Sequence, residues 1–335
     1  MGRRLHPHHL ALAVSLALVG CGGTSHHSTT SSASPPRQPA DPPGLQAAEH
    51  PVVADFPAPH SRSIQAVANT LKPGSQLGLA GSVFLPGANR VAFGVIDNAG
   101  KFIYGPTAIY IADAPNRPAR GPYPAAADSM VPQARFRSKT AAADSADIKA
   151  IYAAKVPFRK PGTYVILAVT RTPQGLIGAP GQIKVSRSSP IPNIGDRPPR
   201  VMTDTVASAH GDLAAIDTRD PHDNMHTQSL AAALGTQEVV LLFSTPQLCQ
   251  SRVCGPVTDI ELQMQAENPF ATFIHQEVYA GNQPKHGLRP PLRAFHLQTE
   301  PWLFVFNVHG RIAARLEGAF GVEAFRQAVA AGSGD

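Results

Sequence analysis

The 335-residue chain has few charged residues, and they form no concentrated patch along the sequence. Asp, Glu, Lys and Arg together make up 16% of it, and the formal net charge is +6. No run of Lys and Arg interleaved with aromatic residues occurs, so the sequence gives no case for nucleic-acid binding. The basic excess favours only an anionic membrane surface nearby. No apolar run reaches the ~20 residues that a membrane-spanning helix needs.

Common catalytic signatures are missing as well. The sequence contains no Gly-x-Ser-x-Gly, no His-Glu-x-x-His and no glycine loop of the kind that cradles phosphate. Cysteine is scarce, because only Cys21, Cys249 and Cys254 occur. Apart from the close pair formed by the last two, there is no zinc-type cysteine pair. We therefore expect the chemistry of the chain to depend on these cysteines.

The N-terminus is typical of an exported protein. Two arginines precede an apolar stretch over residues 10–19, as in a signal peptide. Residues 18–21, Leu-Val-Gly-Cys, resemble the lipobox of bacterial lipoproteins. The resemblance implies removal of residues 1–20 and attachment of a lipid, palmitate included, at Cys21. It places the protein at the extracytoplasmic face of the cell membrane. An ordinary secretory signal with an incidental cysteine is the alternative.

Two segments of biased composition are predicted to lie outside the folded domains. Residues 21–75 are rich in Ser, Thr, Pro and Ala, cannot bury enough apolar surface to become ordered, and predict a disordered tether. Residues 188–225 are rich in Pro, Asp and Arg and predict an interdomain connector that drapes over the following domain.

The end of this connector carries two histidines four positions apart, His222 and His226. On a helix they would share a face and could ligate a metal. The favoured alternative is that Asp223 or Asn224 caps a helix over residues 225–234, which leaves the histidines in solvent.

Residues 76–187 predict an all-β domain. Short alternating apolar runs are separated by Pro-Gly and Asp-Asn turns, without a long helical periodicity, which favours an antiparallel immunoglobulin-like sandwich. Residues 161–164, Pro-Gly-Thr-Tyr, resemble a common corner of such sandwiches, and residues 113–145 are predicted to be a long loop. The predicted strands are 79–85, 90–96, 108–112, 148–156, 163–170 and 182–185.

Residues 226–335 alternate between strand and helix patterns, so the fold class as a whole is multidomain, with an α/β domain after the β-sandwich. The order is β-α-β-α-β-β-α, which is the order of the thioredoxin fold. The predicted elements are strands 238–243, 271–279, 302–307 and 311–316 and helices 255–266, 291–295 and 322–330.

Four short motifs in this region resemble the extracytoplasmic redoxin type of thioredoxin-like domain. Phe-Ser-Thr-Pro at 243–246, followed by Cys249, resembles the strand end that carries the first active-site cysteine. Thr-Glu-Pro-Trp at 299–302 resembles the cis-proline loop that faces the cysteines. Residues 307–312 and 316–318 resemble the hairpin and the run into the last helix. The resemblance implies a cis bond before Pro301, with Glu300 and Trp302 lining the surface over the cysteines.

The cysteine spacing departs from the Cys-x-x-Cys of that family. Here Cys249 and Cys254 have four residues between them, so either could occupy the nucleophile position. A disulfide between them is sterically reasonable, and so small a loop would add little stability by itself. Arg252, between the two cysteines, and Pro256, in the first turn of the predicted helix, favour a thiolate at Cys254.

Three hypotheses for function follow. The first is thiol–disulfide exchange with an envelope or secreted protein, without a cofactor, through Cys249 and Cys254. The second comes from a weaker resemblance to Sco-type copper chaperones, with copper held by the two cysteines and His296. The third is a binding module with a static disulfide. A surface role for His296 and a structural role for His275 are the favoured alternatives to ligation.

Overall fold

The computed structural model describes residues 41–139 and 148–334. Cys21 and the predicted signal peptide lie outside the described residues. Residues from Asp41 onward belong to one compact unit. In the described ranges, none of the helices has the length and apolarity that crossing a membrane requires.

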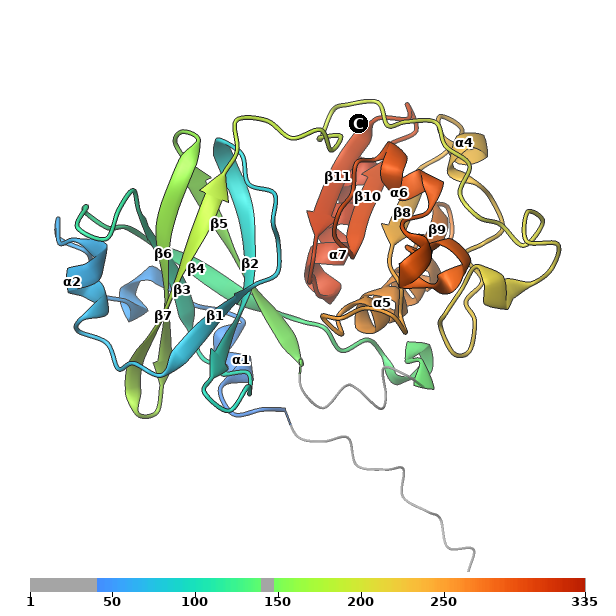
Figure 1. Ribbon diagram of the computed structural model, residues 1–335. Helices are drawn as coiled ribbons and strands as arrows, with labels where there is room; N and C mark the ends of the chain where they lie inside the picture. Colours follow the sequence, from blue (N-terminus) through green and yellow to red (C-terminus); the bar gives the residue numbers. More distant parts are fainter. Residues whose placement is uncertain (1–40, 140–147, 335) are drawn as a thin grey trace, which may run out of the picture. The chain divides into compact units, whose positions relative to one another are not determined.

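The first half of this unit is a seven-stranded antiparallel sheet with the order β1-β2-β5-β4-β3-β6-β7 (Figure 1). Alternate side chains of its strands pack into one apolar core that includes Phe93, Tyr152 and Ile166. The strands are β1 (Ser75–Leu79), β2 (Gly87–Asp97), β3 (Thr107–Ala112), β4 (Arg120–Ser129), β5 (Ala150–Phe158), β6 (Gly162–Thr172) and β7 (Gly175–Val185).

The outer strands of this sheet approach each other, so that it curls toward a closed barrel. The Ser75 hydroxyl donates to the Gly178 carbonyl over 3.1 Å, and the Lys72 N–H donates to the Leu176 carbonyl over 3.0 Å. An immunoglobulin-like sandwich is therefore not confirmed, because all seven strands join in one sheet. The predicted long loop is wrong over β4, where Ala125 and Ala127 are buried between neighbouring strands. Tertiary packing there outweighs the low strand propensity of alanine.

The predicted tether is wrong for residues 41–75. This stretch contains α1 (Leu45–Ala48), the 3-10 turn η1 (Val53–Asp55) and α2 (Ile64–Ala68). Ile64 and Val67 are buried against the sheet. The segment is therefore ordered because the sheet covers apolar side chains that the segment could not bury by itself.

The second half contains a four-stranded sheet with the order β11-β10-β8-β9. β8 and β9 are parallel, whereas β10 is antiparallel to both β8 and β11. The elements follow one another in the predicted order. They are β8 (Val239–Phe243), α5 (Cys254–Glu267), β9 (Thr272–Gln276), α6 (Pro290–Ala294), β10 (Trp302–Phe306), β11 (Ile312–Glu317) and α7 (Val322–Gly332).

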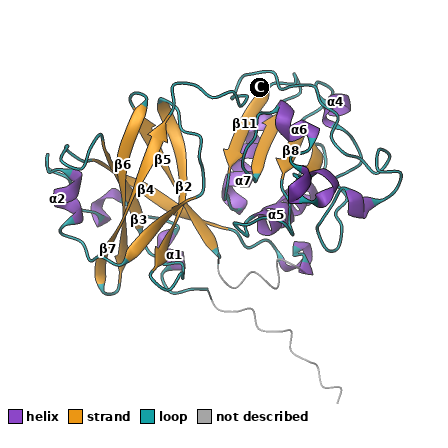
Figure 2. Ribbon diagram, in the orientation of Figure 1, coloured by secondary structure: helices purple, strands orange, loops and turns teal. Residues whose placement is uncertain are grey.

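Helices cover both faces of this sheet (Figure 2). Val240 and Leu242 of β8 pack with α5 and α7, while Leu241 and Phe243 pack with Phe295, which follows α6. This alternation explains why β8 is apolar at every position, since each of its faces is buried. The remaining 3-10 turns are η2 (Ala134–Phe136), η3 (Leu213–Ala215), η4 (Ala280–Asn282) and η5 (Pro284–His286).

The helix predicted over 225–234 is confined to α4 (Leu230–Ala233), so the capping prediction is wrong. Asp223 accepts a hydrogen bond from the Met225 N–H, but this closes a turn and not a helix. His226 is buried, with 1% of its surface exposed, and is not in solvent. The reason is that residues 217–226 pack against β9, as the main-chain bond from His275 to Met225 shows.

An aspartate of the first sheet caps the last helix. The Asp128 carboxylate, at the end of β4, accepts hydrogen bonds from the N–H groups of Gly321, Glu323 and Ala324 over 2.9–3.0 Å. These are donors that the first turn of α7 cannot satisfy itself. A residue almost two hundred positions away thus takes the role of a local N-cap.

We expect Asp128→Ala to lower the free energy of unfolding by roughly 1–2 kcal/mol, because it removes the cap and leaves three amides without an acceptor. Urea denaturation would measure the change. Asp113→Ala is the matched control, since Asp113 forms only a partly exposed ion pair with Arg120. Equal losses in the two variants would contradict a capping role.

Candidate functional site

Cys249 and Cys254 form a disulfide in the loop between β8 and α5, with their Cα atoms 6.0 Å apart. The Leu248 N–H donates to Thr245 and the Arg252 N–H donates to Cys249, so that two successive turns fold the loop back on itself. Cys249 is half-buried, whereas Cys254 is fully buried. An incoming thiol therefore meets the sulfur of Cys249 first.

Cys254 is the first residue of α5, which has 14 residues. The preceding residue, Val253, has no side chain that could cap the helix, and Pro256 brings no N–H to its first turn. The amide end of such a helix carries a partial positive charge that stabilises an anion beside it. The position therefore favours Cys254 as the sulfur that departs as thiolate when the disulfide opens.

The peptide bond between Glu300 and Pro301 is cis, as predicted. The Pro301 carbonyl accepts a hydrogen bond from the Gly318 N–H over 2.9 Å, which fixes the loop to the end of β11. Trp302 does not line the surface over the cysteines, because only 1% of it is exposed. Its ring stacks on Phe304 inside the core.

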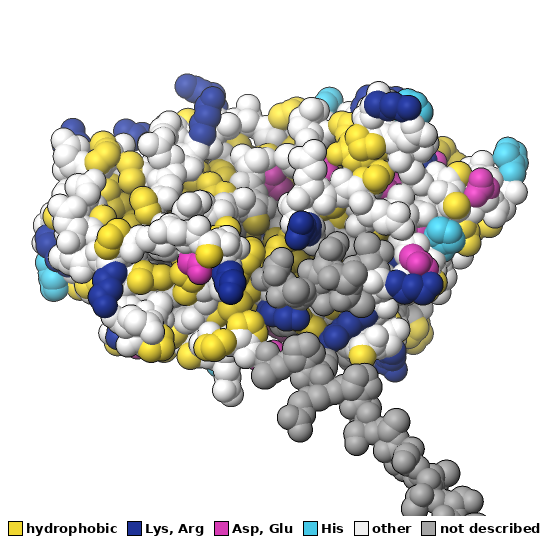
Figure 3. Space-filling model, turned by 60° about the horizontal axis from the view of Figure 1, so that its bottom comes forward, with side chains coloured by type: hydrophobic (Ala, Val, Ile, Leu, Met, Phe, Trp, Pro, Cys, Tyr) yellow, Lys and Arg dark blue, Asp and Glu magenta, His cyan; other side chains and the backbone are white. Residues whose placement is uncertain are grey.

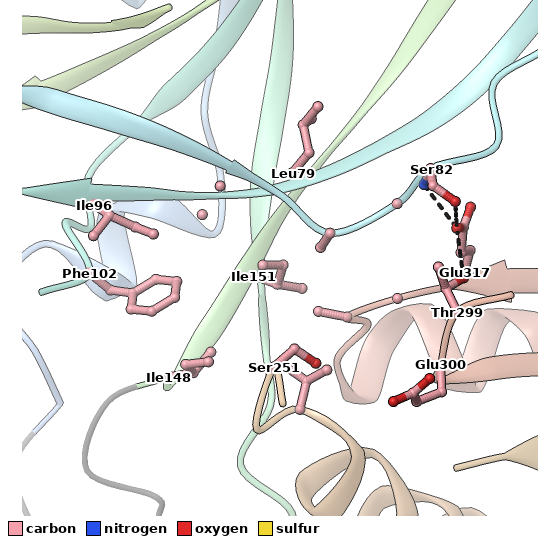
Figure 4. A pocket seen from close by; sticks show the side chains of 17 residues that line it. Leu79, Ser82, Ile96, Phe102, Ile148, Ile151, Ser251, Thr299, Glu300 and Glu317 are labelled. Atoms are coloured by element: carbon pink, nitrogen blue, oxygen red, sulfur yellow. Dashed lines mark hydrogen bonds between the residues drawn. The ribbon is translucent and has the colours of Figure 1, made fainter. Parts of the chain in front are cut away.

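The cysteine loop and the cis-proline loop share a cleft of about 320 Å³ with the first sheet (Figure 4). Ser251 and Val253 contribute from the cysteine loop, and Thr299 and Glu300 from the cis-proline loop. The opposite wall is mainly apolar and comes from the first half of the chain. Its larger side chains are Leu79, Ile96, Phe102, Ile148 and Ile151.

Glu300 is the acidic side chain of the cis-proline loop in this cleft. Burial raises the pKa of Glu300, and a hydrogen bond from the Tyr279 hydroxyl over 3.3 Å opposes the rise only in part. A carboxyl whose pKa is raised on folding stabilises the fold while it is protonated, and this contribution is lost as pH rises through the raised value.

We expect Glu300→Gln to be more stable than the wild type at pH 7, and the difference to vanish below the ordinary pKa of a glutamate. Thermal denaturation between pH 4 and pH 8 would measure this. Glu49→Gln, outside the cleft, is the control for the same substitution elsewhere in the chain. A gain that persists unchanged at acid pH would show that desolvation of the Glu300 carboxylate is not its cause.

A chain of buried hydrogen bonds runs from the cysteine helix to β9. The Thr258 hydroxyl donates to the Cys254 carbonyl over 2.9 Å and lies 2.6 Å from the Ser244 hydroxyl. Ser244 in turn lies 3.1 Å from Nε2 of His275, whose Nδ1 lies 2.7 Å from Asp223. His275 thus connects β9 with Ser244 and Asp223 inside the core, which agrees with the structural role that was the favoured expectation.

No site role was predicted from the sequence for Asp217, Asp223, Ser244 or Thr258. The signal that could have drawn attention to the aspartates is their spacing in Asp-x5-Asp-x-x-His, which ends at His226. The prediction of a helix over 225–234 drew attention away from this spacing, because it gave Asp223 the role of a helix cap.

Glu261 of α5 is a further buried acid that was not predicted from the sequence. It is fully buried, and within the described ranges neither of its carboxylate oxygens has a hydrogen-bond partner. Burial raises the pKa of Glu261 well above its ordinary value, against the attraction of His275. This favours the protonated, uncharged form.

The structure does not bring His296 to the cysteine pair. His296 is exposed and lines a different pocket, together with Ser82 and Ile191. In the part of the chain that the structure describes, no group of three or more metal-ligating side chains includes Cys249, Cys254 or His296. The group that does meet this criterion consists of Asp217, Asp223, His226 and His275.

No protein-family model matches the sequence, and no curated protein matches it either. Among solved structures, the chain is similar to a protein described as thiol:disulfide interchange protein DsbE from Chlorobium tepidum. The identity is 16%, with coverage of 43% of this chain and 99% of that one and a TM-score of 0.31.

Two further solved structures are similar. The first is MTB DsbF in its mixed oxidized and reduced forms, at 16% identity, with coverage of 40% of this chain and 98% of that one and a TM-score of 0.29. The second is the PKD domain of human VPS10 domain-containing receptor SorCS2, at 17% identity, with coverage of 35% and 75% and a TM-score of 0.17.

Proposed function

We propose that the protein carries out thiol–disulfide exchange at the extracytoplasmic face of the cell membrane, through a thioredoxin-like domain formed by residues 226–335. The observation that carries the proposal is the disulfide between Cys249 and Cys254, which lies at the start of α5 in a loop that shares a cleft with a cis-proline loop.

The difference in burial between the two sulfurs supports separate roles for them. A thiolate of the partner attacks Cys249, the more exposed sulfur, and the bond between Cys249 and Cys254 breaks. Cys254 leaves as a thiolate beside the helix N-terminus and later takes up a proton. A second thiol of the partner then attacks the mixed disulfide at the partner's own sulfur. The partner leaves with a disulfide, the protein holds two thiols, and two electrons have passed to it. The reverse sequence reduces a partner.

The partner is an envelope or secreted protein that presents a cysteine on an apolar segment. The apolar wall of the cleft fits such a segment, and the first sheet would then hold the partner while the cysteines react. Lys and Arg side chains are spread over the face in Figure 3 among hydrophobic and uncharged ones. Lipid attachment at Cys21 would keep the protein near its partners.

The reduction potential of the pair tests this proposal. We expect equilibration with glutathione or dithiothreitol mixtures to give a value above about −300 mV, as in disulfides that cycle. A lower value, with a disulfide that resists reduction in the folded protein, would overturn the proposal in favour of a static structural bond.

A further inference from the structure

Four buried side chains of metal-ligating types meet outside the cleft. The hydrogen bonds through Ser244 and Thr258 connect this group to the start of α5. Asp217, Asp223 and His226 come from the segment before α4, and His275 comes from β9. Their exposed fractions are between 0% and 6%. Each offers one ligand atom, and these atoms all lie within 4.8 Å of one another.

His226 has ring nitrogens without hydrogen bonds in this group. Its Nε2 lies 3.3 Å from Oδ1 of Asp223 and 3.7 Å from Oδ2 of Asp217. Nevertheless, in the described part of the chain neither of its nitrogens has a hydrogen-bond partner. A ring nitrogen without a hydrogen bond at 1% exposure is costly, and native structures rarely leave one. The Nε2 atom is placed between two carboxylates, where a bound cation would satisfy all three groups.

His275 presents its second nitrogen to the same carboxylates. Its Nε2 lies 3.3 Å from the main-chain carbonyl of Ser244, which can only accept, and this contact favours a hydrogen on Nε2. Its Nδ1 lies 2.7 Å from Oδ2 of Asp223 and 3.9 Å from Oδ1 of Asp217. A lone pair on Nδ1 facing carboxylate oxygens requires a proton or a metal between them.

Main-chain amides hold both carboxylates in place. Asp217 accepts hydrogen bonds from the N–H groups of Arg219 and Asp223, both over 2.7 Å. Asp223 accepts one from the Met225 N–H over 2.8 Å. Outer contacts of this kind orient metal ligands in known sites. With a metal ion in place of the imidazole protons, the two carboxylates also balance the charge of a divalent cation.

We propose that Asp217, Asp223, His226 and His275 bind one Zn²⁺ ion. Two nitrogen and two oxygen ligands suit zinc, and bonds of about 2.0–2.1 Å in a tetrahedron put ligand atoms roughly 3.3 Å apart. The separations between imidazole nitrogens and carboxylate oxygens, taken over both oxygens of each aspartate, are 2.7–3.9 Å and lie around this value. His222, with 39% of its side chain exposed, lies 3.7 Å from Asp217 on the solvent side of the group.

The ion connects the segment of residues 217–226 to β9, because three of its ligands come from the segment and the fourth comes from the strand. Through Ser244 and Thr258 the same site supports the helix that carries Cys254. The site is distinct from the copper site considered for Cys249, Cys254 and His296, with which it shares no residue.

The test is metal analysis of the purified full chain in the Cys249→Ser/Cys254→Ser background, which removes the thiols as competing ligands. After loading with ZnSO₄ and gel filtration, we expect about one zinc per chain. EDTA should lower the melting temperature by several degrees. Reloading with Co²⁺ should give the visible absorption of a tetrahedral site.

His226→Asn and Asp223→Asn should each lose the zinc and the response to EDTA. His309→Asn, in the exposed turn after β10, is the matched control and should keep both. Retention of no zinc by the parent chain, with a melting temperature indifferent to Zn²⁺ and EDTA, would overturn the proposal and identify the group as a metal-free ion-pair network. Undiminished zinc in His226→Asn would overturn the ligand assignment.

Discussion

Cys249→Ser is expected to lower the rate of thiol–disulfide exchange by about 10³-fold or more, because it removes the sulfur that an incoming thiolate can reach. Cys254→Ser should behave differently. It keeps the half-buried Cys249 and removes the buried sulfur that would resolve the mixed disulfide. Complexes joined through Cys249 should therefore accumulate and be visible on non-reducing gels.

The difference between the two variants tests the roles of the two sulfurs more directly than the loss of activity does. If Cys254 were the attacking residue, Cys249→Ser would trap partners and Cys254→Ser would not. Ser188→Ala is the control, since Ser188 is exposed and lies outside the cleft. It should change the rate by less than about tenfold.

The features predictable from sequence are those set by local chemistry. The strand pattern around Val240 follows from its apolar neighbours, and the cis bond at Pro301 was implied by the resemblance of residues 299–302 to a cis-proline loop. The cysteine pair stood out because the chain has so few cysteines. Each of these inferences needed only residues that are close together in the sequence.

The features that sequence could not predict depend on residues far apart in the chain. β4 forms because its alanines are buried by neighbouring strands, and α2 forms because the sheet buries Ile64. Asp223 is of a residue type that commonly caps helices, yet its carboxylate faces His275, 52 positions away. A polar residue near a helix start is ambiguous until the partner of its side chain is known.

The same limitation applies to Arg219, which lies in the segment that was predicted from its composition to be a connector. Its guanidinium is 5% exposed and lies 2.9 Å from the fully buried Asp259 of α5. It also donates to the carbonyls of Pro221 and Phe136, and Asp259 accepts from the Ser138 N–H over 2.8 Å. One ion pair thus joins the connector, the cysteine helix and the segment after β4.

We expect Arg219→Ala to lower the free energy of unfolding by roughly 3–5 kcal/mol, because it leaves the Asp259 carboxylate buried without its counter-charge. Burial already raises the pKa of Asp259, and the attraction of Arg219 opposes that rise. Denaturant titration with tryptophan fluorescence is suitable, since Trp302 is the chain's only tryptophan and is buried in the second half.

The double variant Arg219→Met/Asp259→Leu separates the cost of an unpaired charge from the value of the pair itself. Replacement of both partners by apolar groups removes the charges together, so most of the lost stability should return. If the double variant were as unstable as Arg219→Ala, the main contribution would come from hydrogen bonds, those of Arg219 to Pro221 and Phe136 and that of the Ser138 N–H to Asp259. In that case the fold is stabilised mainly by hydrogen bonds that connect the three chain segments, and not by the charge of the guanidinium.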